Sequence, residues 1–336
     1  MSARRIDLSV VVPVFNGAET IETVVSHVLR VFHEHSIEIV LVNDGSSDHS
    51  DLVCRTLANQ FPGTIQFLNL ARNFGEHHAV LAGLAVASGD AVAVLDDDGQ
   101  HPAEEALRMW RILRTTGCDV IYGRYIEKQH SLFRNLGSRL NDVMATWLLR
   151  KPADLYLSSF KVMNRFLVDQ ILRYRGPFPY VDGLIFWTTR NIGQIDVQHR
   201  PRIAGSSGYT LRKLVQLWLN MFLGFSIAPL RFAAAIGLMT SFFSVLFLAA
   251  IVVDKLWINP GVPPGVPTIL TCITFFSGVQ LTILGFVGEY VGRSFLSQNG
   301  MPQYVIRESV SLQPGTGVAS EADASTEASG RELAHA

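Results

Sequence analysis

Three consecutive carboxylates form the strongest chemical signal in the chain. Asp96, Asp97 and Asp98 follow the apolar run AVAVL and precede the residues Gly-Gln-His. Like charges crowded in this way raise the free energy of the fold unless a cation compensates them. Mg²⁺ and Mn²⁺ prefer oxygen ligands. If the strand geometry persists through the aspartates, Asp96 and Asp98 point the same way and Asp97 points to the other face. The segment therefore predicts a divalent-cation site, with a solvated acidic turn as the simpler alternative.

A further carboxylate, Asp44, follows the run EIVLVN and opens the segment DGSSD. A carboxylate in this place can accept hydrogen bonds from a base or a ribose. The alternative is a capped turn, because Gly, Ser and Asp favour turns and helix starts, and we assign Ser46 and Asp48 to that role. The chain has neither a Walker A motif nor a GxGxxG motif, which argues against a P-loop NTPase and a dinucleotide dehydrogenase.

The elements that must position these residues are short β-branched runs alternating with helical patterns. Strands are expected at 8–15, 38–44, 64–70 and 91–97, and helices at 18–33, 49–60, 76–88 and 102–116. This order predicts an α/β fold with a mostly parallel, Rossmann-like sheet covered by helices. Ligands bind beyond the carboxyl ends of strands in such sheets. The segments at those ends are 13–17, 44–48 and 96–101.

The amino-acid composition excludes that the whole chain is an ordinary soluble enzyme. Of 336 residues, 48% are hydrophobic and 17% are charged, whereas about 25% charged is usual. Residues 1–225 carry 45 of the 57 Asp, Glu, Lys and Arg, and residues 226–310 carry seven. The length suggests about two domains. The cysteines Cys54, Cys118 and Cys272 lie far apart, which favours reduced thiols and a cytosolic catalytic part.

Two charge-free runs, at about 232–253 and 267–288, dominate the apolar region. Each has the roughly 20 residues needed to cross a bilayer core of about 30 Å. The connector is short and rich in Pro and Gly, which predicts a transmembrane hairpin. More basic residues flank the outer ends than the connector, so both termini and the catalytic domain are expected in the cytoplasm. Buried helices of a soluble protein are the alternative.

The charge is also divided along the chain. Residues 1–119 have a net charge of −8 and residues 120–225 a net charge of +9, which suggests contact with phosphates or anionic lipid. Helical spacing predicts amphipathic helices at 131–150 and 210–225, which would lie in the membrane interface or pack on the core. Residues 309–336 are poor in large apolar side chains and are expected to form a disordered tail.

Four segments resemble successive motifs of family 2 glycosyltransferases with the GT-A fold. They are VVPVFNGAETI, EIVLVNDGSSDHS, LARNFGEHHAVLAGLAVASGD and LDDDGQHPAE. The segments HRPRIAGSSGYTLRKL and LGFVGEYVGR resemble the polyprenyl-phosphate branch of this family. The resemblance spans about residues 8–307. It implies a GT-A domain over 1–225, a hairpin and juxtamembrane segment over 226–308, and the tail beyond.

The resemblance implies a single sugar transfer, with inversion, from a nucleotide sugar to a polyprenyl phosphate such as undecaprenyl phosphate. The partners would be these two substrates and the bilayer, with no nucleic acid and with a possible homo-oligomer. The implied cofactor is Mg²⁺ or Mn²⁺, held by Asp96, Asp98 and Gln100. The implied donor-binding residues are Pro13, Val14, Asp44, Asp96 and Arg124.

The same resemblance implies an acceptor site in the basic half of the chain. The residues carried over to the acceptor phosphate are Arg134, Ser138, Arg202, Ser207 and Tyr209. Those given a catalytic role are Asp98, Arg134 and Arg202. A phosphate acceptor is already an anion, since its second pKa is about 6, so no dedicated general base is required.

Three departures from the family pattern stand out. Ser159 occupies a position that is acidic in many relatives, and Lys161 replaces an arginine; we expect the segment 158–161 to contact the sugar or the acceptor. Gly17 stands where relatives often have Glu, which leaves the nucleotide open. Asp97 stands where Ala is common, and we expect little effect from it.

Two other functions remain open at this point. A processive polysaccharide synthase is suggested by the segment QILRY at 170–174, although two membrane helices alone cannot build a translocation channel. A non-catalytic membrane scaffold or flippase partner is opposed by the presence of Asp96, Asp98, Gln100 and Arg202. The identity of the product would distinguish all three.

Overall fold

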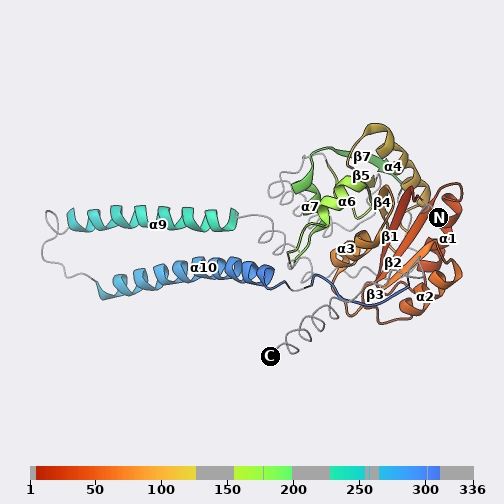
Figure 1. Ribbon diagram of the computed structural model, residues 1–336. Coiled ribbons are helices and arrows are strands. Elements are labelled where there is room, and N and C mark those ends of the chain that lie inside the picture. Colours follow the sequence, from red (N-terminus) through yellow and green to blue (C-terminus); the bar gives the residue numbers. More distant parts are fainter. Residues whose placement is uncertain are drawn as a thin grey trace, which may run out of the picture.

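The β-branched runs form a single mixed sheet in the computed structural model (Figure 1). The structure describes residues 5–125, 155–176, 178–198, 228–253, 257, 265–300 and 302–310. Its strand order is β7-β5-β6-β4-β1-β2-β3-β8. The first four strands in sequence are β1 Leu8–Val14, β2 Ile37–Asn43, β3 Ile65–Leu70 and β4 Ala91–Val94. They pair in parallel, as predicted, so their carboxyl ends share one edge of the sheet.

The remaining strands make the sheet mixed. They are β5 Val120–Tyr125, β6 Lys161–Asn164, β7 Ile192–Val197 and β8 Ile306–Val310. β6 is antiparallel to both β4 and β5, and β5 is parallel to β7. β5 therefore ends at the same edge as β4, and brings Arg124 and Tyr125 there.

Helices cover both faces of the sheet, and this explains the near-continuous apolar character of its central strands. One core lies beneath α3 Glu76–Val86, α6 Arg165–Ile171 and α7 Val181–Thr188. The other lies beneath α1 Ile21–Val31, α2 Ser50–Gln60 and α4 Ala103–Thr116. Each of the four predicted helices is present within three residues of its expected ends. The α/β fold with a mostly parallel sheet is thus confirmed.

Two long helices follow the sheet domain. α9 spans Ala228–Val253 and α10 spans Val266–Gln298, so each contains one of the predicted charge-free runs. Figure 1 shows them side by side, extending away from the sheet. Within the described residues, one helical stretch, Phe275–Gln298, is long and apolar enough to cross a membrane. The predicted helices at 131–150 and 210–225, and the tail beyond residue 310, lie outside the described residues.

The chain returns to the sheet after α10, which the sequence analysis missed. β8 pairs antiparallel with β3 at the sheet edge. Arg55 of α2 forms an ion pair with Glu308 at 2.6 Å, and Arg307 donates to the carbonyl of Ala71. Ser309 and Val310, expected to open the tail, are therefore residues of a strand.

Candidate active site

The predicted donor-site residues gather at the carboxyl edge because β4, β1 and β2 are neighbours in the sheet. Pro13 and Val14 close β1, Asp44 follows β2, and the acidic segment follows β4. The Val14 side chain is fully buried, and its carbonyl accepts the backbone N–H of Asp44 at 2.9 Å. Val14 thus holds Asp44 in place through its backbone.

Asp44 connects two loops of this edge. Its carboxylate accepts the backbone N–H of Phe74 at 2.7 Å and that of Gly75 at 2.9 Å. Burial raises the pKa of Asp44, although these bonds oppose the rise. Gly75 has φ 103°, a conformation that favours glycine, and it directly precedes α3. Each carboxylate oxygen keeps a further lone pair, so Asp44 can fix the loop and still accept a bond from a ligand.

Ser46 and Asp48 have the turn role assigned to them from the sequence. Ser46 donates to the Asn43 side chain, and Asp48 accepts the backbone N–H of Ser50 at 3.0 Å. They also bind the loop after β1, because Ser46 accepts from the Asn16 backbone and Asp48 from that of Ala18. The loops after β1 and β2 therefore form one hydrogen-bonded unit.

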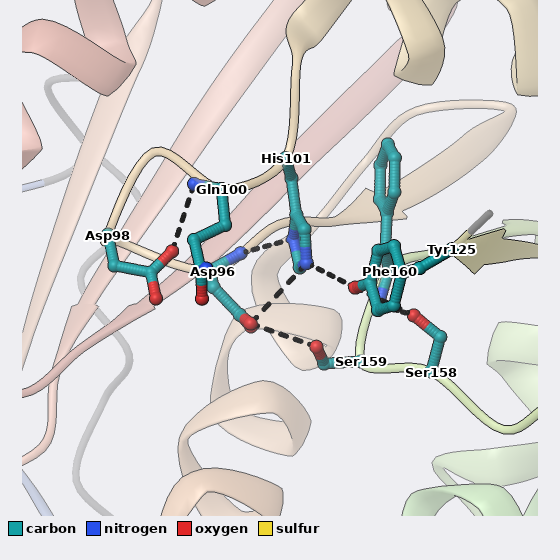
Figure 2. Close-up of polar contacts among 8 residues, drawn as sticks. All are labelled: Asp96, Asp98, Gln100, His101, Tyr125, Ser158, Ser159 and Phe160. Carbon is teal, nitrogen blue, oxygen red and sulfur yellow. Dashed lines mark hydrogen bonds and ion pairs between the residues drawn. The ribbon is translucent and has the colours of Figure 1, made fainter. Parts of the chain in front are cut away.

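The acidic segment is a turn and not a continuation of the strand, since β4 ends at Val94. The condition under which Asp96 and Asp98 were expected to point the same way, that the strand continues through them, is therefore not met. The Asp96 carboxylate points towards Ser159 and His101, whereas that of Asp98 lies against the backbone of Gln100 (Figure 2). Asp98 is 9% exposed, and its Oδ1 accepts the Gln100 N–H at 3.0 Å.

Asp97 faces the loop after β1. Its Oδ2 accepts the backbone N–H of Phe15 at 2.9 Å. Burial raises the pKa of Asp97 to about 7, with the charges of Asp96 and Asp98 adding to the rise. A Cβ at Gly17 would lie 2.5 Å from the same oxygen. Two residues that depart from the family pattern, Gly17 and Asp97, are thus neighbours. Asp97 also fixes the backbone of the loop after β1, although little effect was expected from it.

The donor set of the acidic turn fits a hard cation, because Asp96, Asp98 and Gln100 offer only carboxylate and amide oxygens. Within the part of the chain that the structure describes, no three His, Cys, Asp or Glu side chains form a metal-binding group. A Mg²⁺ site commonly takes one or two carboxylates and completes its shell with substrate phosphates and water. The residues present match that kind of site.

Arg124 reaches the same edge from the end of β5. It forms an ion pair with Asp196 of β7, and both side chains are about half exposed. The hydrogen bond from Arg124 lowers the pKa of Asp196. The other predicted phosphate ligands, Arg134, Ser138, Arg202, Ser207 and Tyr209, lie outside the described residues.

The segment 158–161 divides between two roles. Ser159 donates to Asp96 at 2.9 Å, at the site edge. Lys161 is 4% exposed and pairs with Asp182 of α7, which also accepts from Tyr122 at 2.8 Å. Lys161 therefore ties α7 to the sheet, and the expectation that it contacts a sugar or acceptor is wrong. His101, within the predicted segment 96–101, and Tyr125 at the end of β5 were given no role from the sequence, and His101 lies next to Asp96.

Comparison with known proteins identifies the family of this chain. The model of the family described as Glycosyl transferase family 2 matches residues 9–172. The SfII prophage-derived bactoprenol glucosyl transferase of Shigella flexneri is 32% identical, covering 90% of this chain and 98% of that protein. The undecaprenyl-phosphate 4-deoxy-4-formamido-L-arabinose transferase of Photorhabdus laumondii is 29% identical, covering 90% and 94%.

Among solved structures, glucosyl-3-phosphoglycerate synthase from Mycobacterium tuberculosis, in complex with Mn²⁺ and UDP, is 18% identical with a TM-score of 0.49. The aligned region covers 64% of this chain and 80% of the synthase chain. An α/β sheet with an acidic turn at its carboxyl edge, in a chain with these relatives, defines a glycosyltransferase. The chain belongs to glycosyl transferase family 2.

Proposed function

We propose that this enzyme transfers one sugar from a nucleotide sugar to a polyprenyl phosphate, with inversion and with Mg²⁺ or Mn²⁺. The observation that carries the proposal is the combination, in one chain, of an acidic turn at the sheet edge with two long apolar helices. The relatives named for undecaprenyl phosphate and bactoprenol are similar along nearly their whole length, helices included.

The donor is expected to lie over the ends of β1, β2 and β4. Asp44 and the loop after β1 would contact the nucleoside, and Asp96 the ribose or the cation. Asp98 and Gln100 would hold the cation, which when bound would neutralise charge developing on the leaving diphosphate. Arg124, and Arg202 from the basic half, would pair with phosphate oxygens, for which the guanidinium fork is suited.

In the reaction, an oxygen of the acceptor phosphate forms a bond to the anomeric carbon while the bond from that carbon to the diphosphate breaks. The leaving nucleoside diphosphate takes the electron pair, and attack from the opposite face inverts the anomeric configuration. The acceptor oxygen is already anionic near neutral pH, so no proton must be removed from it. Ser159, where many relatives have an acid, is compatible with this mechanism because no base is required.

The acceptor is a lipid, and α9 and α10 supply a means of reaching it. We infer that they cross the membrane as a hairpin, with the sheet domain and both termini on the cytoplasmic side. At 1.5 Å per residue, helices of 26 and 33 residues are longer than the apolar core of a bilayer. Their large apolar side chains point outward, among them Met239, Phe242, Phe243, Ile273, Leu281, Leu284 and Phe295.

The experiment is a transfer assay with the full chain in lipid nanodiscs. Undecaprenyl phosphate is supplied with Mg²⁺ or Mn²⁺ and a panel of UDP-, GDP- and other nucleotide sugars, and the lipid is extracted for mass spectrometry. We expect one sugar added to the lipid phosphate with one nucleotide sugar. A polymer would instead support the processive synthase, and no transfer with any donor would support the scaffold.

A further inference from the structure

His101 stands in a fixed tautomeric form next to the acidic turn. Its Nδ1 lies 3.0 Å from the backbone nitrogen of Asp96. That nitrogen can only donate, so Nδ1 must accept and its lone pair must face Asp96. The ring proton is therefore on Nε2, which lies 2.7 Å from the hydroxyl oxygen of Tyr125. A backbone group of the acidic turn thus determines which way the imidazole donates.

Two hydrogen bonds, made by the consecutive residues Ser158 and Ser159, connect Tyr125 back to Asp96, and the peptide bond joins these two residues. Ser158 donates to the Tyr125 hydroxyl at 3.0 Å and accepts the backbone N–H of Phe160 at 3.0 Å. The next residue, Ser159, donates to Oδ2 of Asp96 at 2.9 Å. The series leaves Asp96 through its backbone and returns to its carboxylate, and so closes a ring of contacts (Figure 2). We call these five residues, Asp96, His101, Tyr125, Ser158 and Ser159, the Asp96 ring.

Packing holds the Asp96 ring rigid. The His101 side chain is 2% exposed. Its imidazole stacks on the fully buried Phe160, with ring centroids 4.6 Å apart and planes 9° from parallel. It lies 6.0 Å from the Tyr125 ring at 17°. Burial raises the pKa of Tyr125, so its hydroxyl keeps its proton. A buried polar network whose members are all bonded specifies a single arrangement of its side chains.

The Asp96 ring engages only one oxygen of the Asp96 carboxylate. Oδ2 accepts from Ser159 and lies 3.5 Å from Nε2 of His101. Among the described residues no contact to Oδ1 is recorded, and the side chain is 30% exposed. The carboxylate is therefore oriented from the protein side, with its second oxygen at the carboxyl edge where a ligand would lie.

We propose that His101 and Ser159 are positioning residues that orient Asp96 Oδ1 towards the nucleotide sugar and its cation. This inference rests on the proposed function, because it needs a nucleotide at this edge. The Asp96 ring joins the ends of β4 and β5 to the segment before β6, so the geometry of the donor site depends on all three. His101 and Ser159 act through Asp96 and do not touch the reacting atoms.

The first test measures binding of Mn²⁺ with UDP, and of Mn²⁺ with GDP, to the full chain by calorimetry. We expect Ser159→Ala to weaken binding of the nucleotide that the wild type prefers by about 10- to 100-fold, the range usual for loss of a group that orients a ligand-binding side chain. Ser159→Thr keeps the hydroxyl and should restore binding. Wild-type affinity in Ser159→Ala would overturn the proposal.

The matched control is Ser88→Ala. Ser88 also donates its hydroxyl to a carboxylate, that of Glu38, at 3.0 Å, but just before β4 begins, at the opposite end of the sheet. Both variants should lower the melting temperature by a few degrees, and only Ser159→Ala should weaken nucleotide binding. Equal effects on binding would show a merely structural role and overturn the proposal.

His101 allows its two contacts to be separated. In His101→Asn the amide oxygen can replace Nδ1 and keep the bond from Asp96, whereas in His101→Gln the amide nitrogen can replace Nε2 and reach Tyr125. We expect each to lose part of the affinity. Because the Asp96 ring is closed, Tyr125→Phe and Ser159→Ala should be non-additive in a double-mutant cycle. Strict additivity would contradict the ring.

A metal-free measurement tests the tautomer. In ¹⁵N-histidine-labelled protein, with His101→Gln used to assign the signal, His101 should show an unprotonated Nδ1 and a protonated Nε2. A protonated Nδ1 would overturn the inference. If the wild type itself binds neither nucleotide with Mn²⁺, the proposed function fails, whereas the tautomer still reports on the Asp96 ring. The two failures are therefore distinguishable.

Discussion

The sheet domain and the α9–α10 pair differ in the exposure of their apolar side chains. In the sheet domain, central strands bury them on both faces, and polar groups gather at the edge where β1, β2 and β4 end. In α9 and α10, large apolar residues such as Phe242 and Leu281 are more than 60% exposed. A surface of this kind is unfavourable in water. The proposed membrane hairpin would account for this difference, and the candidate site lies in the region whose apolar side chains are buried.

The largest expected effect separates chemistry from anchoring. We predict that Asp98→Ala lowers transfer by at least about 100-fold, because it removes the buried carboxylate proposed to hold the cation. The variant should still fractionate with membranes, since α9 and α10 are unchanged. Asp169→Ala, which removes an exposed carboxylate on α6, is the control and should transfer normally. Full activity of Asp98→Ala would remove Asp98 from the metal site.

The next prediction compares the same substitution in both regions. Leu281 of α10 is 69% exposed and Leu52 of α2 is 59% exposed. We expect Leu52→Lys to change stability by less than about 0.5 kcal/mol, as at a water-facing surface. Leu281→Lys should cost about 2.5 to 3.5 kcal/mol of membrane insertion, because it puts a charge in hydrocarbon. Thermal melting measures the change in stability, and a glycosylation-based insertion assay measures the free energy of membrane insertion. Equal tolerance at the two positions would contradict the membrane hairpin.

A smaller effect is expected at the contact between two of the site loops. In Gly17→Ala the new Cβ would meet Asp97 Oδ2 and displace it from the Phe15 N–H. We predict a loss of about 1 to 2 kcal/mol in the free energy of unfolding of the sheet domain. In an Asp97→Ala background the same change should cost less. Denaturant titration of the four proteins gives this coupling, and an equal cost in both backgrounds would exclude the contact.

The cysteines give the smallest and simplest comparison. Cys54 is fully buried in the sheet domain, and burial raises the pKa of its thiol to about 12. Cys118 is partly buried in that domain, and Cys272 is partly buried on α10. In membranes at pH 8, a water-soluble maleimide should modify Cys118 about ten times faster than Cys272. Detergent should expose Cys272 and leave Cys54 protected. Ready labelling of Cys272 in intact membranes would place α10 in water.

The sequence predicted the four parallel strands and their helices because each strand is a short, largely apolar run that is followed by a helical pattern. It missed β5, β6, β7 and β8. Of these, β6 and β8 are short and pair with strands that are distant in the sequence. β8, IRESV, has three consecutive polar residues between two apolar ones, and charged side chains are common on edge strands. Nothing local indicates that the chain rejoins the sheet after α10.

At the site, the sequence identified Asp44, Asp96 and Asp98 from their positions after strands. It could not show where the strand ends, and because β4 ends at Val94, strand alternation does not apply to Asp96 and Asp98. It could not find the Asp96 ring, since His101 and Ser159 are 58 positions apart and meet only through tertiary packing. The signal that was present is the histidine itself, in DDDGQH, to which no role was given.

The most direct test of the central claim is the mass of the lipid recovered from wild type and Asp98→Ala side by side. Both are given undecaprenyl phosphate, Mn²⁺ and the nucleotide sugar selected from the panel, with EDTA as a second control. The wild-type lipid should gain the mass of one sugar residue, and neither Asp98→Ala nor the EDTA sample should. Sugar transfer that survives both the substitution and EDTA, or a lipid that carries a chain of sugars, would contradict the account.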